Sequence, residues 1–162
     1  SQAALAAYRD HRAGALLLVD LDGFKAVNDS QGHGSGDQVL VRVAQRLSGL
    51  ARANDTAARL GGDEFALVLN AVDSPDAAME MDHKVLAALV APIGLDNGQH
   101  VLIGASIGVA LFQGPAVEAL PALMDRADRA LYVSKRGGKG LVTLADVPGA
   151  AQLPQELPPA ST

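Results

Sequence analysis

The chain has 162 residues, 49% of them apolar, which is enough to bury one hydrophobic core. Its 13 basic and 18 acidic side chains give a net charge of −5, and aromatic residues make up only 3%. This composition argues against a nucleic-acid-binding protein, which needs basic patches for phosphates and aromatic rings that stack on bases. The absence of cysteine excludes disulfides, thiolate metal sites and thiol nucleophiles.

No apolar run reaches the roughly 20 residues that a membrane-spanning helix needs, and no secretory signal is visible. We therefore expect a cytoplasmic domain without direct membrane contact, which a longer, membrane-anchored parent protein can still contain. Residues 147–162 hold four of the eight prolines and show no apolar periodicity. The sequence thus predicts one folded domain over residues 1–146 and a Pro-rich linker or disordered tail over 147–162.

The first half of the chain begins with an Ala-rich segment, residues 2–11, for which we expect a helix. The apolar run at 15–20 is typical of a strand buried on both faces. A helix is predicted to begin near Phe24, and a longer one over 37–50, where apolar residues recur at helical spacing. The segment at 37–50 is expected to be the first long helix.

The next segments, 56–60 and 65–69, flank Gly61 and Gly62, and a glycine pair supplies the positive φ that tight hairpin turns require. They predict a β-hairpin with an acidic tip. Further along we expect a helix over 74–90, a turn at 96–98, a strand over 101–111, a helix over 120–136 and a strand over 141–144. Because hairpins make the sheet mostly antiparallel, the expected fold class is α+β.

Four carboxylates lie at the predicted strand end and hairpin tip: Asp20, Asp22, Asp63 and Glu64. Like charges about 4 Å apart cost roughly 4 kcal/mol at an effective dielectric near 20, so protonation or a bound cation must relieve such a cluster. Oxygen ligands favour Mg²⁺, Mn²⁺ or Ca²⁺ over zinc. The alternative is that some of these acids are turn residues that face water. The spacing matches neither an EF-hand loop nor a P-loop.

Four blocks in order, DLDGFKAVND at 20–29, Gly32-His33, Gly36-Asp37 and GGDEF at 61–65, together resemble the GGDEF family of diguanylate cyclases. The resemblance covers roughly residues 15–144. It implies a palm-type, ferredoxin-like nucleotide cyclase fold with a central, mostly antiparallel sheet flanked by helices. It also implies condensation of two GTP into cyclic di-GMP and pyrophosphate across a homodimer.

The resemblance also implies roles for individual residues. Asp20, Asp63 and the carbonyl of Leu21 would ligate Mg²⁺ or Mn²⁺, and Asp63, Glu64 and Lys25 would form the catalytic group. Glu64 would either assist the metal or accept the proton of the 3′-hydroxyl. The side chains and amides implied to bind GTP are Gly23, Phe24, Lys25, Asn28, Asp37, Gly61, Gly62, Lys135 and Lys139. Of these, Asn28 and Asp37 would read the guanine edge.

An Arg-x-x-Asp pattern, Arg52 to Asp55, precedes the hairpin tip at the offset of the family's inhibitory product site. The resemblance implies that Arg52 and Asp55, with help from Arg59, bind cyclic di-GMP and give product inhibition. A helix-end charge pair is the alternative for this short pattern.

The sequence departs from the family where Lys139 and Gly140 stand, since many members have Arg and Asn there. A point charge then replaces a forked guanidinium at one triphosphate contact. Two alternatives to an active cyclase therefore stay open: a catalytically silent GTP-binding regulatory module, and a cyclic di-GMP receptor that acts through Arg52 and Asp55. The tail also indicates further domains of a longer parent chain, of the phosphodiesterase type.

Overall fold

The structure is a computed structural model that describes residues 13–113 and 119–145. Its main feature is a five-stranded sheet in the order β2-β3-β1-β6-β7, with all pairs antiparallel except β6 with β7. The strands are β1 (Gly14–Asp22), β2 (Thr56–Gly61), β3 (Glu64–Leu69), β6 (Gly104–Phe112) and β7 (Val142–Leu144). The predicted α+β class and the central, mostly antiparallel sheet flanked by helices are confirmed.

Strand β1 lies in the middle of the sheet and pairs along its length with β3 on one side and β6 on the other. Its apolar side chains alternate between the two faces, as a strand with a period of two residues requires. Leu17 and Val19 join the larger core cluster, whereas Leu16 and Leu18 join the smaller one. Both faces of β1 are therefore buried, as the continuous apolar run predicts.

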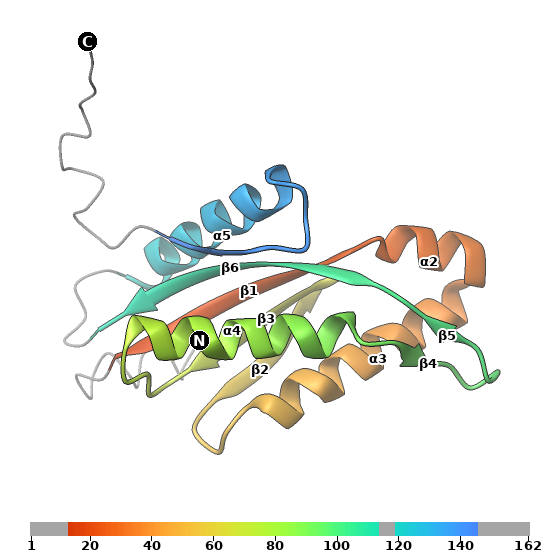
Figure 1. Cartoon of the computed structure of the whole chain (residues 1–162), viewed down its shortest axis with the longest axis horizontal. Coiled ribbons are helices and arrows are strands. Elements are labelled where there is room, and N and C mark those ends of the chain that lie inside the picture. The colour runs from red at the N-terminus through yellow and green to blue at the C-terminus, as the bar shows by residue number, and fades with distance from the viewer. Residues whose placement is uncertain (1–12, 114–118, 146–162) are drawn as a thin grey trace, which may run out of the picture.

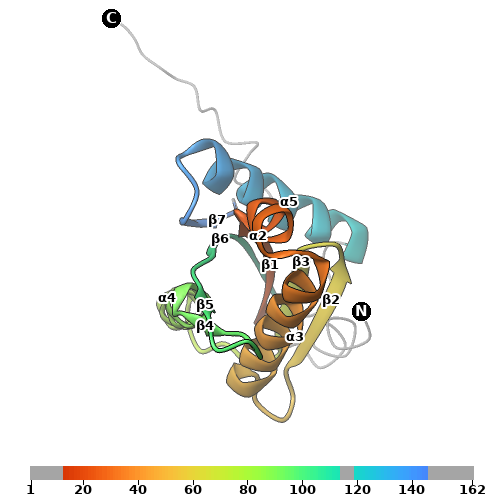
Figure 2. The same cartoon turned by 90° about the vertical axis from the view of Figure 1, so that its right-hand side faces the viewer.

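Helices cover both faces of the sheet. Helices α3 (His33–Leu50) and α4 (Pro75–Val90) bury their apolar stripes on the face that carries Leu17 and Val19. Helix α5 (Leu120–Arg136) packs on the opposite face, so the molecule has three layers (Figure 2). A short helix, α2 (Phe24–Gln31), lies between β1 and α3, beyond the end of the sheet (Figure 1).

Helix α5 lies very close to β6 at Gly108. A Cβ built on Gly108 would overlap the Ala127 carbonyl and the Leu131 backbone, so only glycine permits this approach. The contact fixes the course of α5 along the sheet and brings its last turn to the end of β1. This is how a residue near the C-terminus of the chain reaches the predicted carboxylate cluster.

The predicted hairpin and the helices at 74–90 and 120–136 are confirmed. The Ser74 hydroxyl caps α4 by accepting the Ala77 N–H at 3.0 Å. The strand predicted over 101–111 is confirmed from residue 104 onward as β6, but its predicted start is wrong, because β5 (His100–Val101) pairs with β4 (Ile93–Gly94) in a separate small sheet. The predicted helix at 2–11 and the tail at 147–162 lie outside the described residues.

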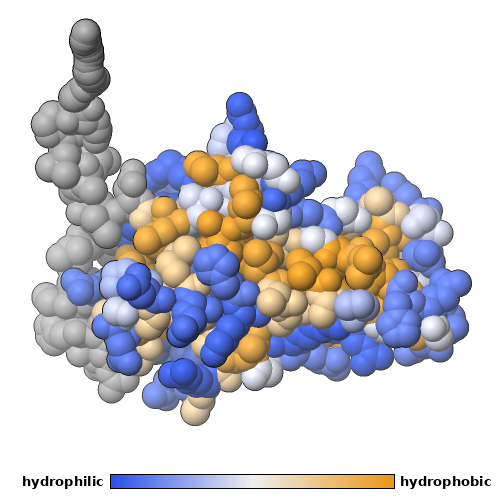
Figure 3. Space-filling view, viewed as in Figure 1, coloured by the Kyte–Doolittle hydropathy of each residue, from blue (hydrophilic) through white to orange (hydrophobic). Residues whose placement is uncertain are grey.

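Apolar side chains gather along the middle of the face seen in Figure 1, and hydrophilic side chains border them (Figure 3). The large apolar side chains that are exposed include Leu102, Tyr132, Val133 and Leu141. Within the part of the chain that the structure describes, no helix combines the length and hydropathy that crossing a membrane requires.

Candidate active site

The end of β1 meets the tip of the β2–β3 hairpin. Asp20 lies opposite Glu64 in the strand register, and the Leu21 N–H donates to the Asp63 carbonyl at 3.1 Å. Gly62 has φ 53° at the tip, a left-handed conformation that glycine adopts without strain. The sequence therefore turns the chain at the point where its acidic residues come beside β1.

Arg59 stabilises this tip from within the hairpin. Its Nε donates to the Gly62 carbonyl at 2.9 Å, three residues further along the chain. A β-bulge between Arg59 and Gly61 bends the strand just before the turn. The resemblance implies that Arg59 helps Arg52 and Asp55 to bind product, whereas in the structure its side chain is hydrogen-bonded to the hairpin tip.

The side-chain ammonium of Lys135, on α5, lies between two carboxylates of β1. The Lys135 Nζ is 3.2 Å from Asp20 Oδ2 and 3.0 Å from Asp22 Oδ1. The pKa of Lys135 is raised, since these two carboxylates outweigh the opposing effect of its burial. Burial and the negative charges of Asp63 and Asp22 raise the pKa of Asp20 above its ordinary value, against the lowering effect of Lys135.

Asp22 holds neighbouring segments together. Its Oδ2 accepts the Ser106 hydroxyl at 2.7 Å and the Gly140 N–H at 3.1 Å, while Oδ1 accepts Lys135. Burial raises the pKa of Asp22, but the hydrogen bonds and the Lys135 charge lower it by more, so the pKa lies below the ordinary value. Asp22 thereby ties the α5–β7 turn, including the exposed Lys139, to the end of β1.

Glu64 completes the group at the hairpin tip. Partial burial and the charges of Asp20, Asp128 and Asp63 raise its pKa, against the attraction of Lys135. The sequence predicts that four carboxylates gather here. Within residues 13–113 and 119–145, however, no three acidic or histidine side chains converge as a metal-binding group. Asp22 is turned to its structural partners instead, which leaves Asp20 and Asp63 as the carboxylates closest to a cation-binding arrangement.

Helix α2 begins directly after β1. Gly23 precedes it with φ 82°, and no side chain caps the first turn by a hydrogen bond. The backbone N–H groups at this end form the positive end of the helix dipole next to the carboxylates, and the exposed Lys25 adds a positive charge. Such an arrangement favours a phosphate group.

Asn28, on α2, lies against Gly36 on α3. A Cβ at Gly36 would overlap the Asn28 side-chain oxygen, so the glycine makes room for the amide. Asp37, the next residue along α3, is exposed. The structure therefore brings the predicted Asn28 to the segment that carries the predicted Asp37.

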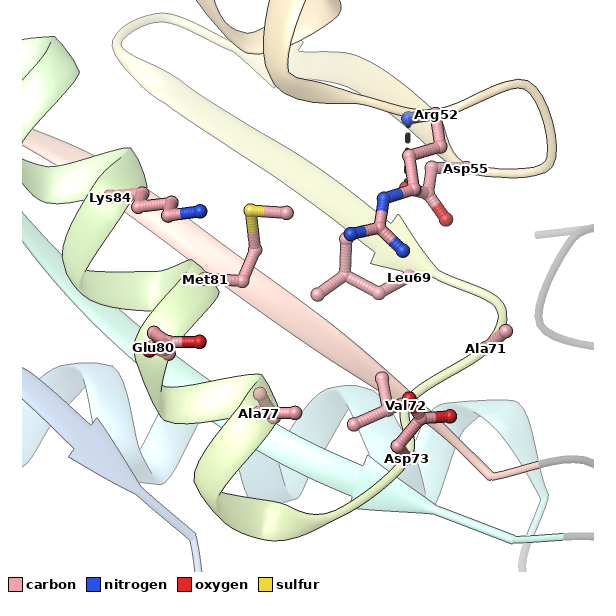
Figure 4. Close-up of a pocket in the computed structure, with 11 residues that line it drawn as sticks. Arg52, Asp55, Leu69, Ala71, Val72, Asp73, Ala77, Glu80, Met81 and Lys84 are labelled. Atoms are coloured by element: carbon pink, nitrogen blue, oxygen red, sulfur yellow. Dashed lines mark hydrogen bonds between the residues drawn. The ribbon is translucent and has the colours of Figure 1, made fainter.

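Arg52 and Asp55 form a second group, at a pocket of about 240 Å³ between the end of β3 and α4. The Asp55 carboxylate accepts the Arg52 N–H at 2.9 Å and the Asn70 N–H at 3.1 Å. Figure 4 shows the Arg52 guanidinium extending over Leu69 toward the side of the pocket formed by α4, from which Lys84 also projects.

Sequence reasoning missed three participants. Ser106 and the Gly140 N–H anchor Asp22, and Lys84 lines the pocket beside Arg52. Ser106 had a readable signal, since it is a polar residue within an otherwise apolar strand and is fully buried. Such a residue requires a hydrogen-bond partner, and Asp22 supplies it.

The family model described as diguanylate cyclase, GGDEF domain, matches residues 1–140. The chain belongs to the GGDEF domain family. This GGDEF domain is 45% identical over 138 residues to the bifunctional diguanylate cyclase/cyclic di-GMP phosphodiesterase MucR of Pseudomonas aeruginosa. It is 41% identical over 133 residues to the diguanylate cyclase TpbB of the same species.

These matches cover 85% and 82% of the GGDEF domain described here, but only 20% of MucR and 30% of TpbB. The crystal structure of the TpbB GGDEF domain superimposes with a TM-score of 0.80 at 38% identity, covering 91% of each chain. The GGDEF domain of DgcB from Caulobacter crescentus, solved in complex with c-di-GMP, gives 0.77 at 31% identity, covering 88% of this chain and 84% of that one.

Proposed function

We propose that this domain is a diguanylate cyclase that condenses two GTP molecules into cyclic di-GMP and releases two pyrophosphates. The observation that carries the proposal is the meeting of Asp20 and the Asp63 segment beside the uncapped start of α2. That arrangement provides negative charge for a cation and positive charge for a triphosphate in adjacent positions. Relatives named as diguanylate cyclases support the same activity.

The residues present fit a divalent cation that shares its coordination with substrate. Asp20 already accepts a cationic group, the Lys135 ammonium, and the nearby Asp63 charge raises the pKa of Asp20. Mg²⁺ is commonly held by one or two carboxylates together with substrate phosphates, so a set of three protein carboxylates is not required. Asp20, Asp63 and the Leu21 carbonyl would hold Mg²⁺ or Mn²⁺. The ion would stabilise the charge that develops on the reacting and departing oxygens.

The chain's own groups would bind and orient GTP. The amides of Gly23, Phe24 and Lys25 would bind the triphosphate at the start of α2, with Lys135 reaching it from the last turn of α5 and Lys139 from the turn that follows. Asn28 and Asp37 pair with the donors and acceptors of guanine, which adenine would leave mispaired. Gly61 and Gly62 leave room beside the nucleotide, since a Cβ on either would meet no other atom of the protein within 4 Å.

In each half-reaction, the 3′-oxygen of one GTP bonds to the α-phosphorus of the other, and the bond from that phosphorus to the β-phosphate oxygen breaks. Glu64 would receive the hydroxyl proton, and its raised pKa, caused by burial and neighbouring carboxylates, makes it a stronger base than an ordinary glutamate. One domain has one proposed GTP site, formed by the end of β1 and the start of α2, whereas the reaction joins two GTP molecules. Two copies must therefore face each other, so that each presents its GTP to the other.

The test is incubation of the purified chain with GTP and Mg²⁺, with chromatography for cyclic di-GMP. Specific activity should rise with protein concentration, because the reaction needs a homodimer. Asp63→Ala should lower turnover by about a thousandfold or more, which corresponds to about 4 kcal/mol in the barrier. Asp125→Ala, an exposed aspartate on α5, is the matched control and should keep the wild-type rate. GTP binding without product at high concentration would instead indicate a silent regulatory module.

We also propose that Arg52 and Asp55 bind the product and inhibit the enzyme. Asp55 fixes the loop through two backbone N–H groups, and Arg52 extends its guanidinium into the pocket, where it can pair with a guanine edge or a phosphate. The pocket of about 240 Å³ is smaller than the roughly 300–1,000 Å³ typical of whole ligands, so it fits part of cyclic di-GMP. Arg52→Ala should keep the initial rate and remove inhibition by added product.

A further inference from the structure

The two carboxylates that share the Lys135 ammonium are held very differently. Asp22 also accepts the Ser106 hydroxyl at 2.7 Å and the Gly140 N–H at 3.1 Å. In the described part of the chain, Asp20 has Lys135 as its ionic partner, at 3.2 Å, and Asp63 as a repelling neighbour. Asp22 is therefore a fixed anchor for the ammonium, whereas Asp20 can exchange it for another cation.

We propose that Lys135 competes with the divalent cation for Asp20, and that Asp22 is a positioning residue that keeps Lys135 beside the site after the exchange. The proposal rests on the proposed function, because it takes Asp20 as the metal ligand. Two cations on one carboxylate repel each other, so the ion alone binds weakly while Lys135 lies on Asp20. When GTP binds, its triphosphate draws the Lys135 ammonium away from Asp20, and the Asp20 carboxylate becomes available to the divalent cation.

This exchange makes the metal and the nucleotide promote each other's binding. Bound nucleotide draws Lys135 away from Asp20 and so removes the metal's competitor. Bound metal neutralises the carboxylates that would otherwise repel the triphosphate. The partial burial of the three side chains supports direct ion pairs of Lys135 with Asp20 and Asp22 rather than a long-range electrostatic effect. The Lys135 side chain is 29% exposed, and those of Asp20 and Asp22 are 19% and 10% exposed. The close packing of α5 at Gly108 also limits how far its last turn can move.

The decisive measurement is Mn²⁺ binding in the absence of nucleotide, followed by the electron paramagnetic resonance signal of free Mn²⁺. Lys135→Met should bind Mn²⁺ about three- to tenfold more tightly than the wild type, which is the range expected for removal of one partly shielded competing ion pair. Circular dichroism checks the fold, and Lys135→Gln serves if the methionine variant does not fold.

Lys139→Met is the matched control. It removes the same charge from the adjacent turn, and its side chain has no ion pair with Asp20. Methionine accepts the left-handed φ of 67° no worse than lysine does. This variant should change Mn²⁺ affinity by less than about twofold, because exposed charges at a distance are screened. An equal gain in both lysine variants, or no gain in Lys135→Met, would overturn the proposal.

The role of Asp22 is tested by a double-mutant cycle. Asp22→Asn leaves Lys135 held by Asp20 alone, so Mn²⁺ affinity should fall below that of the wild type by about threefold or more. In the Lys135→Met background, Asp22→Asn should change the affinity by less than about twofold. Equal losses in both backgrounds would mean that Asp22 acts through its charge or through local structure, and not through Lys135.

A second titration uses 3′-deoxy-GTP, which binds but lacks the reacting hydroxyl. The nucleotide should raise Mn²⁺ affinity more in the wild type than in Lys135→Met, and equal enhancement would contradict the exchange. Failure of the two proposals is distinguishable. If the wild type makes cyclic di-GMP but Lys135→Met and Lys139→Met bind Mn²⁺ equally well, only the proposed competition of Lys135 with the metal is wrong. The expected Mn²⁺ results without any product from GTP overturn only the cyclase.

Discussion

Two acidic regions of this domain show how surroundings decide what a carboxylate does. At the end of β1, Asp20 and Asp22 lie partly exposed around the Lys135 ammonium. On α4, Asp82 is fully buried, and neither carboxylate oxygen has a hydrogen-bond partner among residues 13–113 and 119–145. Burial raises its pKa to about 7. In the first region, Lys135 compensates the two charges, and we propose that a divalent cation can take its place on Asp20. The second has no compensating group, so its charge opposes folding.

The largest expected difference between these regions is in turnover. Asp20→Asn should lower cyclic di-GMP synthesis by about a thousandfold, or about 4 kcal/mol in the barrier, because the exchangeable cation ligand is lost. Its free energy of unfolding should change by less than about 1 kcal/mol, because loss of the Lys135 pair is offset by relief of repulsion from Asp63. The measurements are product formation and urea unfolding. Asp82→Asn is the control and should keep the wild-type rate. An equal loss of turnover in both variants would contradict a specific role of Asp20.

The second difference is in the pH dependence of stability. The ordinary pKa of aspartate is 3.8, and that of folded Asp82 is about 7, so between these values only the folded state keeps the proton. The free energy of unfolding therefore falls as pH rises from about 4 to 7, then levels, by at most about 4 kcal/mol from this group. Asp82→Leu should remove this part of the pH dependence and be more stable than the wild type at pH 8.

Urea unfolding of both proteins at several pH values gives the measurement. The difference between the two curves isolates Asp82, because Asp20 and Glu64, whose pKa values are also raised, contribute equally to both. Parallel curves for the wild type and Asp82→Leu would show that the buried carboxylate has found a partner in solution.

Local signals in the sequence predict much of this molecule. The glycine pair and the flanking apolar segments predict the hairpin, and the apolar run predicts a strand buried on both faces. The first and last motif blocks supply the acidic residues at the end of β1 and at the hairpin tip. Asp82 also had a local signal, since it falls with Ala78, Val85 and Leu89 on one helical face, but periodicity is read from apolar residues and passes over an acid.

The contacts between distant segments cannot be predicted in this way. Lys135 is 113 residues from Asp22, and Ser106 is 84 residues from it. Their meeting depends on β1 lying between β3 and β6, and on the close approach of α5 at Gly108. Nothing in the local pattern tells which of two neighbouring aspartates is anchored and which is exchangeable.

The anchoring of Asp22 predicts a moderate effect on stability. Asp22→Ala should lower the free energy of unfolding by about 1–3 kcal/mol, because the buried Ser106 hydroxyl and the Gly140 N–H lose their acceptor. Urea unfolding measures the loss. Adding Ser106→Ala to Asp22→Ala should cost little more, since the hydroxyl that needed a partner is removed with it. Fully additive losses would mean that the Ser106–Asp22 hydrogen bond contributes nothing to stability.

The smallest expected effect concerns Asn28, a polar side chain positioned by packing rather than by an ion. Gly36→Ala should push the Asn28 amide away, because the new Cβ would overlap its oxygen, which belongs to a flexible side chain. Stability should not fall, since alanine favours a helix over glycine by about 1 kcal/mol. Affinity for 3′-deoxy-GTP should drop about tenfold, as loss of one buried hydrogen bond to guanine predicts.

Gly34→Ala is the matched control, because it lies on the same helix and its new Cβ would meet no other atom within 4 Å. It should gain the same helix propensity and keep nucleotide affinity. Calorimetric titration with 3′-deoxy-GTP and a thermal melt of each variant measure the two quantities. If the alanine at 36 binds the nucleotide as tightly as the alanine at 34, Asn28 does not read the base. The room that Gly36 provides then serves only the packing of α2 on α3.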